Sequence, residues 1–245
     1  SSNTLTGSFD VSLADGGEDG AVPATGTVTI GINAVDDAPT LDTNTGATVA
    51  EGATIGITTG ELSGSDNDTA STALVYTVTV APVNGQLELT SGPGVAITSF
   101  TQDDLDNGLV VYVHDGSETT SDSFDFTLGD ATTTLATDTF NLTVTPVNDG
   151  PQLTVTNPAV NIAEGGTQLI DNGILAGSDS DDTATGITYT ASNITNGQLE
   201  FVAAPGVAIT SFTQDDIDNN LVQFVHDSSN TLTGSFDVSL ADGGE

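Results

Sequence analysis

The pattern of apolar and polar positions along the chain predicts β-strands almost throughout. Five segments show the alternation of apolar and polar residues that a strand with one buried face requires. They are residues 74–80, 86–89, 109–114, 124–128 and 140–145. Thr, Val and Ile are abundant in and around these segments, which also favours strands. The sequence therefore predicts an all-β chain.

Two short polar motifs lie between the predicted strands and recur later in the chain. Asn84-Gly85, matched by Asn196-Gly197, is the dipeptide most typical of a two-residue hairpin turn. The motif TQDD begins at Thr101 and again at Thr213. Its threonine can cap a single helical turn whose first residues are acidic. We expect a hairpin at the first motif and one helical turn at the second.

The chain is an array of similar segments. SFTQDDLDNGLVVYVHDGS at 99–117 returns as SFTQDDIDNNLVQFVHDSS at 211–229, a shift of 112 residues (211 − 99). The first 18 residues are identical to 228–245. A repeat of this length has the size of one β-sandwich domain. The predicted fold class is therefore all-β, with Ig-like antiparallel β-sandwiches in tandem.

The repeat length divides the chain into three parts. Residues 1–36 are predicted to be the C-terminal strands of a preceding repeat, 37–148 a complete repeat, and 149–245 a repeat that lacks its final strand. The absent strand is expected to resemble residues 19–35. We expect it to come either from a continuation of the array or from a neighbouring chain.

The composition narrows the functions that the chain can have. Lys and Arg number 0 against 35 Asp plus Glu, so the formal net charge is −35. Without cations the chain cannot neutralise phosphates, which excludes binding to nucleic acid or to anionic membrane surfaces. It has no Cys and therefore no disulfide or thiolate zinc site. Its longest apolar run, 109–113, is far shorter than the roughly 20 residues of a membrane helix.

The acids recur at matching places in each repeat, on predicted loops and linkers. The candidate ligands are Asp36, Asp37, Glu51, Asp66, Asp68, Asp115, Asp130, Asn148, Asp149, Glu164, Asp179, Asp181 and Asp242. Acids that converge at one end of a sandwich repel one another unless a cation binds. Calcium takes six to eight oxygen ligands, so we predict calcium sites assembled from distant segments, since neither D-x-D motif completes an EF-hand. The alternative is that these acids are solvated turn residues.

One stretch resembles a known family. FTQDDLDNGLVVYVHDGSETTSDSFDFTLGD at 100–130 resembles the core of cadherin-like repeats of chondroitin-sulfate-proteoglycan type, found in large bacterial extracellular adhesins. In such arrays calcium lies between successive domains. The resemblance implies one junction formed by Glu51, Asn148, Asp149, Asp179, Asp181 and Asp242, and half of another formed by Asp36, Asp37, Asp66, Asp68 and Asp130. Glu118 is a further candidate acid, but Asn230 replaces it in the next repeat.

These observations favour a structural spacer of an extracellular bacterial adhesin or filament, for example in a biofilm. In this interpretation calcium rigidifies tandem cadherin-like sandwiches at the cell surface. The expected partners are neighbouring repeats or copies of the chain, arranged head to tail. Other parts of the full protein are expected to bind a host surface or a glycan. The alternative is a module whose loops bind a glycan or a cell, although the chain has no Trp for that task. Ice binding is a third option, suggested by the Thr run 132–134.

An enzyme is not expected. The paired carboxylates recur in every repeat, whereas an active site needs no copy in each domain. His114 and His226 occupy the same position of their repeats, at the end of a predicted strand. We interpret both as structural residues rather than as zinc ligands.

Overall fold

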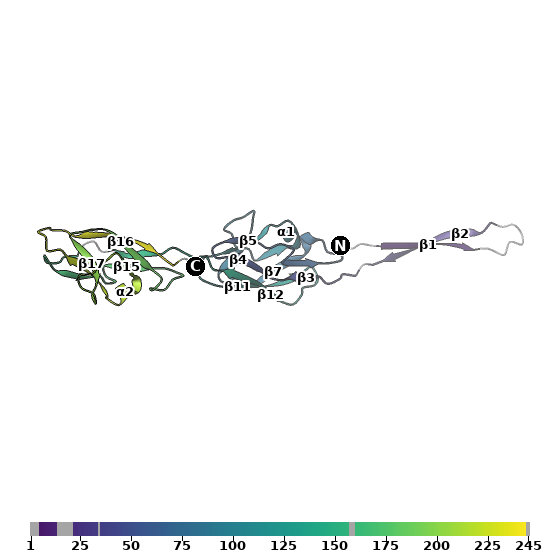
Figure 1. Ribbon diagram of the computed structural model, residues 1–245. Coiled ribbons are helices and arrows are strands. Elements are labelled where there is room, and N and C mark those ends of the chain that lie inside the picture. Colours follow the sequence, from purple (N-terminus) through teal and green to yellow (C-terminus); the bar gives the residue numbers. More distant parts are fainter. Residues whose placement is uncertain (1–4, 14–21, 34, 157–159, 244–245) are drawn as a thin grey trace. The chain divides into compact units, whose positions relative to one another are not determined.

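The computed structural model describes residues 5–13, 22–33, 35–156 and 160–243 (Figure 1). The chain divides into two compact units, 1–146 and 147–245. Strands dominate both units, and the described helices are single turns. The predicted all-β fold class is confirmed. None of the described helices has the length and apolar character needed to cross a membrane.

Unit 1 contains a sandwich of two main sheets and a short strand pair. The first sheet has the order β5 (Thr54–Gly56), β10 (Val110–His114) and β8 (Gly85–Leu89). The second has the order β4 (Ala47–Ala50), β12 (Asp138–Thr145), β11 (Ser121–Gly129), β7 (Val75–Val80) and β9 (Ser99–Thr101). β3 (Thr40–Asn44) pairs with β6 (Leu62–Ser65). All pairs are antiparallel except β4 with β12, and the five predicted strands are confirmed.

Alternate side chains of these strands fill one core between the sheets. Its largest members are almost completely buried aromatic residues: Tyr76, Tyr112, Phe124, Phe126 and Phe140. The Tyr76 ring stacks on Phe100 with 4.9 Å between ring centroids. Burial of such side chains is the main favourable contribution to folding in a chain of this kind.

Unit 2 repeats this arrangement. Its first sheet has the order β14 (Thr167–Leu169), β20 (Val222–His226), β17 (Gly197–Phe201) and β18 (Ala208–Ile209). The second has the order β19 (Ser211–Thr213), β16 (Thr188–Thr195) and β21 (Ser235–Ala241), and β13 (Gln152–Thr156) pairs with β15 (Leu175–Ser178). β11 has two strand neighbours, β7 and β12. Its counterpart β21 pairs with β16 and with no other strand in the described ranges.

A two-stranded antiparallel ribbon precedes the first sandwich in the sequence (Figure 1). It consists of β1 (Leu5–Leu13) and β2 (Ala24–Ile32), paired over nine residues from Leu5 opposite Ile32 to Leu13 opposite Ala24. Residues 6–13 and 24–32 are all exposed. β2 is part of the segment 19–35 predicted to resemble a final strand. Residues 19–21 and 34 lie outside the described ranges.

The predicted hairpin at Asn84-Gly85 is wrong. β7 pairs with β11 and β9, whereas β8 pairs with β10, so the chain crosses from one sheet to the other at this point. Gly85 is required for a different reason. A Cβ atom there would lie 2.4 Å from the carbonyl oxygen of Val113 on β10. The same close approach occurs in unit 2, where a Cβ on Gly197 would lie 2.4 Å from the carbonyl oxygen of Val225.

The predicted helical turn is confirmed in both units, as α1 (Gln102–Asp106) and α2 (Gln214–Asp218). Thr101 forms a capping box with Asp104: its Oγ1 accepts from the Asp104 N–H at 3.1 Å, and the Asp104 carboxylate accepts from the Thr101 N–H at 2.8 Å. Thr213 and Asp216 make the same pair. A 3-10 turn, η1 (Ser71–Ala73), precedes β7.

Candidate metal centre

The loop after β6 holds the first D-x-D pair in a tight turn. Asp66 Oδ1 accepts hydrogen bonds from the N–H groups of Asp68 at 2.9 Å and Thr69 at 2.8 Å. The Asp68 N–H is the main reason that the pKa of Asp66 lies below its usual value. The pKa of Asp68 is raised, chiefly by the neighbouring side chain of Asp66 and then through burial. The two carboxyl groups are therefore close enough to influence each other.

Asp130 reaches the same place from the end of β11. Its Oδ1 accepts from the N–H groups of Thr132 and Thr133, each at 2.6 Å. These backbone bonds, that from Thr133 first, lower the pKa of Asp130. The negative charge of Asp130 also acts on Asp66, so the two loops converge.

The linker acids ahead of β3 join this group. The Thr132 hydroxyl donates to Asp36 as well as to Asp130. The Asn67 side-chain amide donates to Asp37 Oδ2 at 3.3 Å. Unit 1 thus brings five of the predicted ligands together from three separate segments. They are Asp36, Asp37, Asp66, Asp68 and Asp130; we call this set the upper acid group.

Three oxygen atoms of the upper acid group are buried and have no hydrogen-bond partner. They are Asp66 Oδ2, Asp68 Oδ1 and Asp130 Oδ2. A buried polar atom without a partner is costly, and a bound cation would remove that cost by coordinating the oxygen. Carboxylate oxygens are the ligands of calcium and magnesium. The residues present therefore fit a hard divalent cation.

Unit 2 repeats this arrangement with the other predicted acids. Asp179 Oδ1 accepts from the N–H groups of Asp181 at 2.8 Å and Asp182 at 3.1 Å, while Asp179 Oδ2 is buried without a partner. The Asp149 N–H donates to Asp181 Oδ2 at 2.5 Å. The Asn148 side-chain amide donates to Asp242 Oδ2 at 3.0 Å. Asn148, Asp149, Asp179, Asp181 and Asp242 are thereby connected within this unit.

Glu51 lies at the other end of the first sandwich. Its N–H donates to the carbonyl oxygen of Thr145, the last residue of β12, at 3.0 Å. Carboxylate oxygens of Glu51 and Glu118 lie within 4.8 Å of each other. Glu118 is the acid that the repeat does not retain, because Asn230 replaces it in the next copy. In the structure Glu118 nevertheless lies beside Glu51, which is a predicted ligand.

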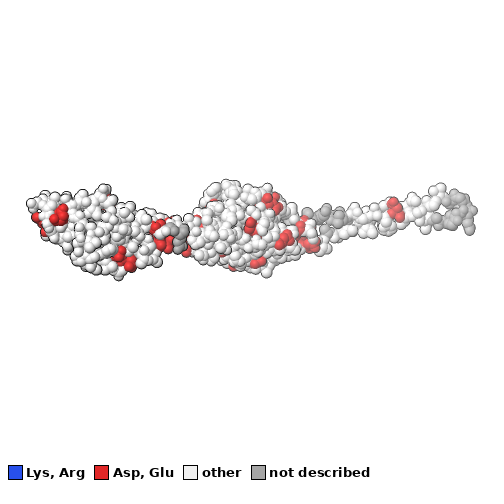
Figure 2. All heavy atoms as spheres, in the orientation of Figure 1, with Lys and Arg blue, Asp and Glu red and all other residues white. Residues whose placement is uncertain are grey.

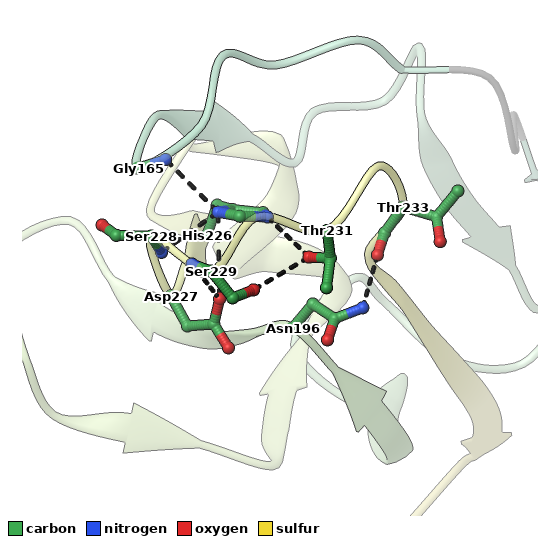
Figure 3. Close-up of polar contacts among 8 residues, drawn as sticks. All are labelled: Gly165, Asn196, His226, Asp227, Ser228, Ser229, Thr231 and Thr233. Carbon is green, nitrogen blue, oxygen red and sulfur yellow. Dashed lines mark hydrogen bonds and ion pairs between the residues drawn. The ribbon is translucent and has the colours of Figure 1, made fainter.

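A buried histidine, His226, organises the turns that contain Gly165 and Asp227 (Figure 3). Nδ1 of His226 accepts from the N–H groups of Gly165 at 3.3 Å and Ser228 at 3.1 Å, and Nε2 contacts the Thr231 hydroxyl at 3.3 Å. Both ring nitrogens are thus occupied by protein groups, as a structural histidine requires.

The matching residue of unit 1, His114, binds the N–H groups of Gly52 at 3.1 Å and Gly116 at 3.2 Å. The ring therefore ties the turn that carries Glu51 to the turn that carries Asp115. Asp115 Oδ1 accepts from the Ser117 N–H at 3.0 Å. In the described part of the chain, neither Asp115 nor the exposed Glu164 is seen to contact another predicted ligand.

One buried residue that positions the first D-x-D loop is not apparent from the sequence. Gln102 Oε1 accepts from the Gly64 N–H at 2.8 Å and from the Tyr76 hydroxyl at 2.7 Å. Gly64 is two residues ahead of Asp66, so the amide fixes the strand from which the loop starts. Gln214 makes the same two bonds, to Gly177 at 2.8 Å and Tyr189 at 2.6 Å. The glutamine of TQDD occurs in both repeats, and this is the signal in the sequence that could have indicated its role. The motif by itself predicts only a helix cap.

The acids form separate groups on the face shown in Figure 2, and no basic side chain lies among them. Positive charge for these groups must therefore come from outside the chain.

Comparisons with known proteins show the family of the chain. A family model described as cadherin-like matches residues 39–144 and 151–245. The chain is 35% identical over 215 residues to the extracellular matrix organizing protein FRAS1 of Homo sapiens, covering 84% of this chain and 5% of that protein. It is 34% identical over 202 residues to extracellular matrix protein 3 of Lytechinus variegatus, covering 82% of this chain and 6% of that protein. It is 35% identical over 165 residues to chondroitin sulfate proteoglycan 4 of Homo sapiens, covering 66% of this chain and 7% of that protein.

The chain thus spans between 5% and 7% of the length of these relatives. Among solved structures, the chain matches the human desmocollin-1 ectodomain at 13% identity and a TM-score of 0.46, with 98% of this chain and 44% of that one covered.

Proposed function

The chain belongs to the cadherin-like family, and from this we propose that it is a structural spacer of a large extracellular adhesin or filament. In this proposal the repeats 37–148 and 149–245 are rod segments, and calcium at their junctions rigidifies them. Their partners are the neighbouring repeats, head to tail. The bacterial source expected from the sequence stays a prediction, since the relatives named above are animal proteins. No catalytic role is part of the proposal.

The observation that carries the proposal is the set of buried carboxylate oxygens without partners. They lie on Asp66, Asp68 and Asp130 in unit 1 and on Asp179 in unit 2. The D-x-D turn after β6 and the D-x-D turn after β15 share the same backbone hydrogen bonds. A calcium ion supplies the coordination that these oxygens lack. Extracellular modules of this kind bind calcium weakly, with Kd on the order of 10⁻⁴ to 10⁻³ M.

Chain connectivity supports a shared site at the junction. Glu51 is bonded to Thr145, and Asp149, which is bonded to Asp181, follows only four residues later. Four residues span at most about 14 Å. The acids at the end of one repeat and those at the start of the next are therefore joined by a short linker.

Calcium should raise the melting temperature. A ligand that binds only the folded state adds about 1.4 kcal/mol per site at ten times its Kd, which for a chain of this size corresponds to about 3–6 °C. Thermal unfolding is followed by circular dichroism in excess chelator and in 10 mM calcium. Identical melting curves under the two conditions would refute the proposal.

Two variants test whether the calcium-induced shift in melting temperature arises at the upper acid group. Asp66→Asn keeps the size of the side chain but removes a charge from the upper acid group, and it should reduce the calcium-induced shift. Asp138→Asn is the matched control. Asp138 is exposed and its carboxylate accepts from the N–H of the next residue, Thr139. The control should retain the full calcium shift.

No observation favours the glycan-binding alternative. Among the described residues Phe9 is the only aromatic side chain that is largely exposed, and the tyrosines are buried in the cores. A sugar-binding surface usually needs an exposed aromatic ring for stacking.

A further inference from the structure

A short segment covers one edge of the first sheet of unit 2. Residues 202–209 leave the end of β17 and turn back along it. Their last two residues form β18, in which Ala208 lies opposite Glu200 and Ile209 opposite Leu199. We call this segment the strap. Because an uncovered strand edge readily pairs with another chain, the strap protects the edge of β17.

Unit 1 has a matching strap at residues 90–97, beside β8. Ala96 lies opposite Glu88, and the Ile97 N–H donates to the carbonyl oxygen of Leu87 at 2.9 Å. Both straps end in the same sequence, PGVAI. The strap is therefore a feature of the repeat.

Burial of apolar side chains holds one end of the strap of unit 2 in place. Ile209 packs against the core. Towards the tip, Val202 and Val207 are 42% and 60% exposed, and Pro205 is exposed as well. The strap carries no charged residue. Its tip therefore depends on contacts other than apolar burial.

A buried glutamate supplies such a contact. Glu200 is only 4% exposed, and its carboxylate accepts from the Gly206 N–H at 2.7 Å. Gly206 has a φ of 83°, a conformation that favours glycine. The amides of Gln198 and Gln223 donate to the same carboxylate at 2.9 Å and 2.8 Å. The carboxylate is thus held in place by two amides and in turn holds the tip of the strap.

Glu88 has the same role in unit 1. It is 5% exposed and accepts from the Gly94 N–H at 2.8 Å and from the Gln86 amide at 2.6 Å. Val111 lies opposite Glu88, whereas Gln223 lies opposite Glu200. The contact is therefore present in both sandwiches, with one amide donor fewer in unit 1.

The described groups that bond to these two carboxylates or lie opposite them are uncharged. For Glu200 they are Gln198 on β17, Gln223 on β20, and Gly206 and Ala208 of the strap. For Glu88 they are Gln86 on β8, Val111 on β10, and Gly94 and Ala96 of the strap. The ionisation of each glutamate therefore decides the charge at its strap.

An N–H group bonds an ionised carboxylate about twice as strongly as a neutral acceptor. The hydrogen bonds to Glu200, that from Gln198 first, lower its pKa from the ordinary value of 4.5. The carboxylate is therefore ionised at neutral pH. The strong bond to Gly206 is lost as pH falls through the folded pKa of Glu200.

We propose that the strap is a pH-controlled cover, which the ionised glutamate holds closed and which opens from its tip when the glutamate is protonated. Opening releases the N–H of Gly206 in unit 2 and of Gly94 in unit 1. It leaves the edges of β17 and β8 available for strand pairing in acid, while both stay covered at neutral pH. The inference depends neither on calcium nor on the proposed function.

Glu200→Gln tests the proposal at pH 6, because the amide keeps the shape of the carboxylate but carries no charge. Amide hydrogen exchange is measured by NMR in excess chelator and divided by the intrinsic rate. The Gly206 N–H reports opening of the strap. The N–H groups of β20, which lies between β14 and β17, report unfolding of the whole sandwich.

In Glu200→Gln the Gly206 N–H should exchange at least about tenfold faster than in the unmodified chain, because the charge-assisted bond is lost. Exchange of the β20 amides should not change. Glu164→Gln is the matched control, since it makes the same chemical change at an exposed position of unit 2. It should leave the exchange of Gly206 as it is. An unchanged Gly206 rate in Glu200→Gln would overturn the proposal.

A second measurement follows the protection of Gly206 relative to β20 between pH 6 and pH 3. In the unmodified chain this ratio should fall, and in Glu200→Gln it should be low at both pH values. The same fall in both chains would overturn the proposal, because it would mean that Glu200 does not control the strap.

Unit 1 provides an independent test with Glu88→Gln, read at the Gly94 N–H and at β10, which lies between β5 and β8. Gly94 should lose protection while β10 keeps it. Equal loss of protection in the strap and in the central strand, in both Glu88→Gln and Glu200→Gln, would overturn the proposal. The glutamates would then hold the whole sandwich rather than the strap.

Discussion

At the scale of single residues, the chain stabilises carboxylates without any basic side chain. Backbone N–H groups and side-chain amides take the place of Lys and Arg. Glu200 is the clearest case: its carboxylate is almost completely buried and accepts from the amides of Gln198 at 2.9 Å and Gln223 at 2.8 Å and from the Gly206 N–H at 2.7 Å. These bonds stabilise the charged form, and they hold the loop at Gly206 against β17.

Glu200 should therefore make stability depend on pH in the acid range. Its pKa is lowered from the ordinary value of 4.5, first by the hydrogen bond from Gln198. A carboxyl group with a lower pKa in the folded state adds stability above its unfolded pKa, and this stability is lost as pH falls through the folded value. Urea denaturation of Glu200→Gln between pH 6 and pH 3 should show a smaller decrease than the unmodified chain. Glu164→Gln, which removes an exposed carboxylate, is the control, and an equal decrease in both variants would contradict the prediction.

At the scale of elements, the α1 turn links two strands of the first sandwich, β6 and β7. It places Gln102 so that one amide oxygen binds both Gly64 on β6 and Tyr76 on β7. Gln102→Leu should lower the free energy of unfolding by about 2–6 kcal/mol, since two buried donors lose their acceptor at about 1–3 kcal/mol each. Tyr76→Phe removes one of those donors, so Gln102→Leu should cost less in that background. Urea denaturation of the two single variants and the double variant gives the coupling, and strict additivity would contradict the prediction.

The same element shows where prediction from the sequence works and where it fails. The strands and the cap at Thr101 follow from local patterns, so they could be predicted. The crossing between sheets at Asn84-Gly85 could not be predicted, because the sheet to which β8 belongs is decided by its pairing with the distant β10. The meeting of Asp66 with Asp130 followed from a family resemblance rather than from spacing. The role of Gln102 is invisible in the sequence, since its partners lie 38 and 26 residues away.

At the scale of the whole molecule, charge is the dominant constraint. A formal charge of −35 with no basic residue means that repeats repel one another unless cations bind between them. Monovalent salt screens this repulsion over roughly 8–10 Å but coordinates nothing. A divalent ion such as calcium can neutralise carboxylates and also bridge two of them, so calcium should reduce the repulsion between repeats more than sodium chloride does at the same ionic strength.

Calcium should consequently restrict the motion between successive repeats in solution. Small-angle scattering in 10 mM calcium should give a larger and better defined maximum dimension than in chelator with sodium chloride at matched ionic strength. Asp149→Ala should remove this difference while unit 2 stays folded, because the substitution deletes the carboxylate but keeps the N–H that binds Asp181. If the calcium and sodium chloride curves coincide, the acids at the junctions are solvated loop residues and calcium has no mechanical role.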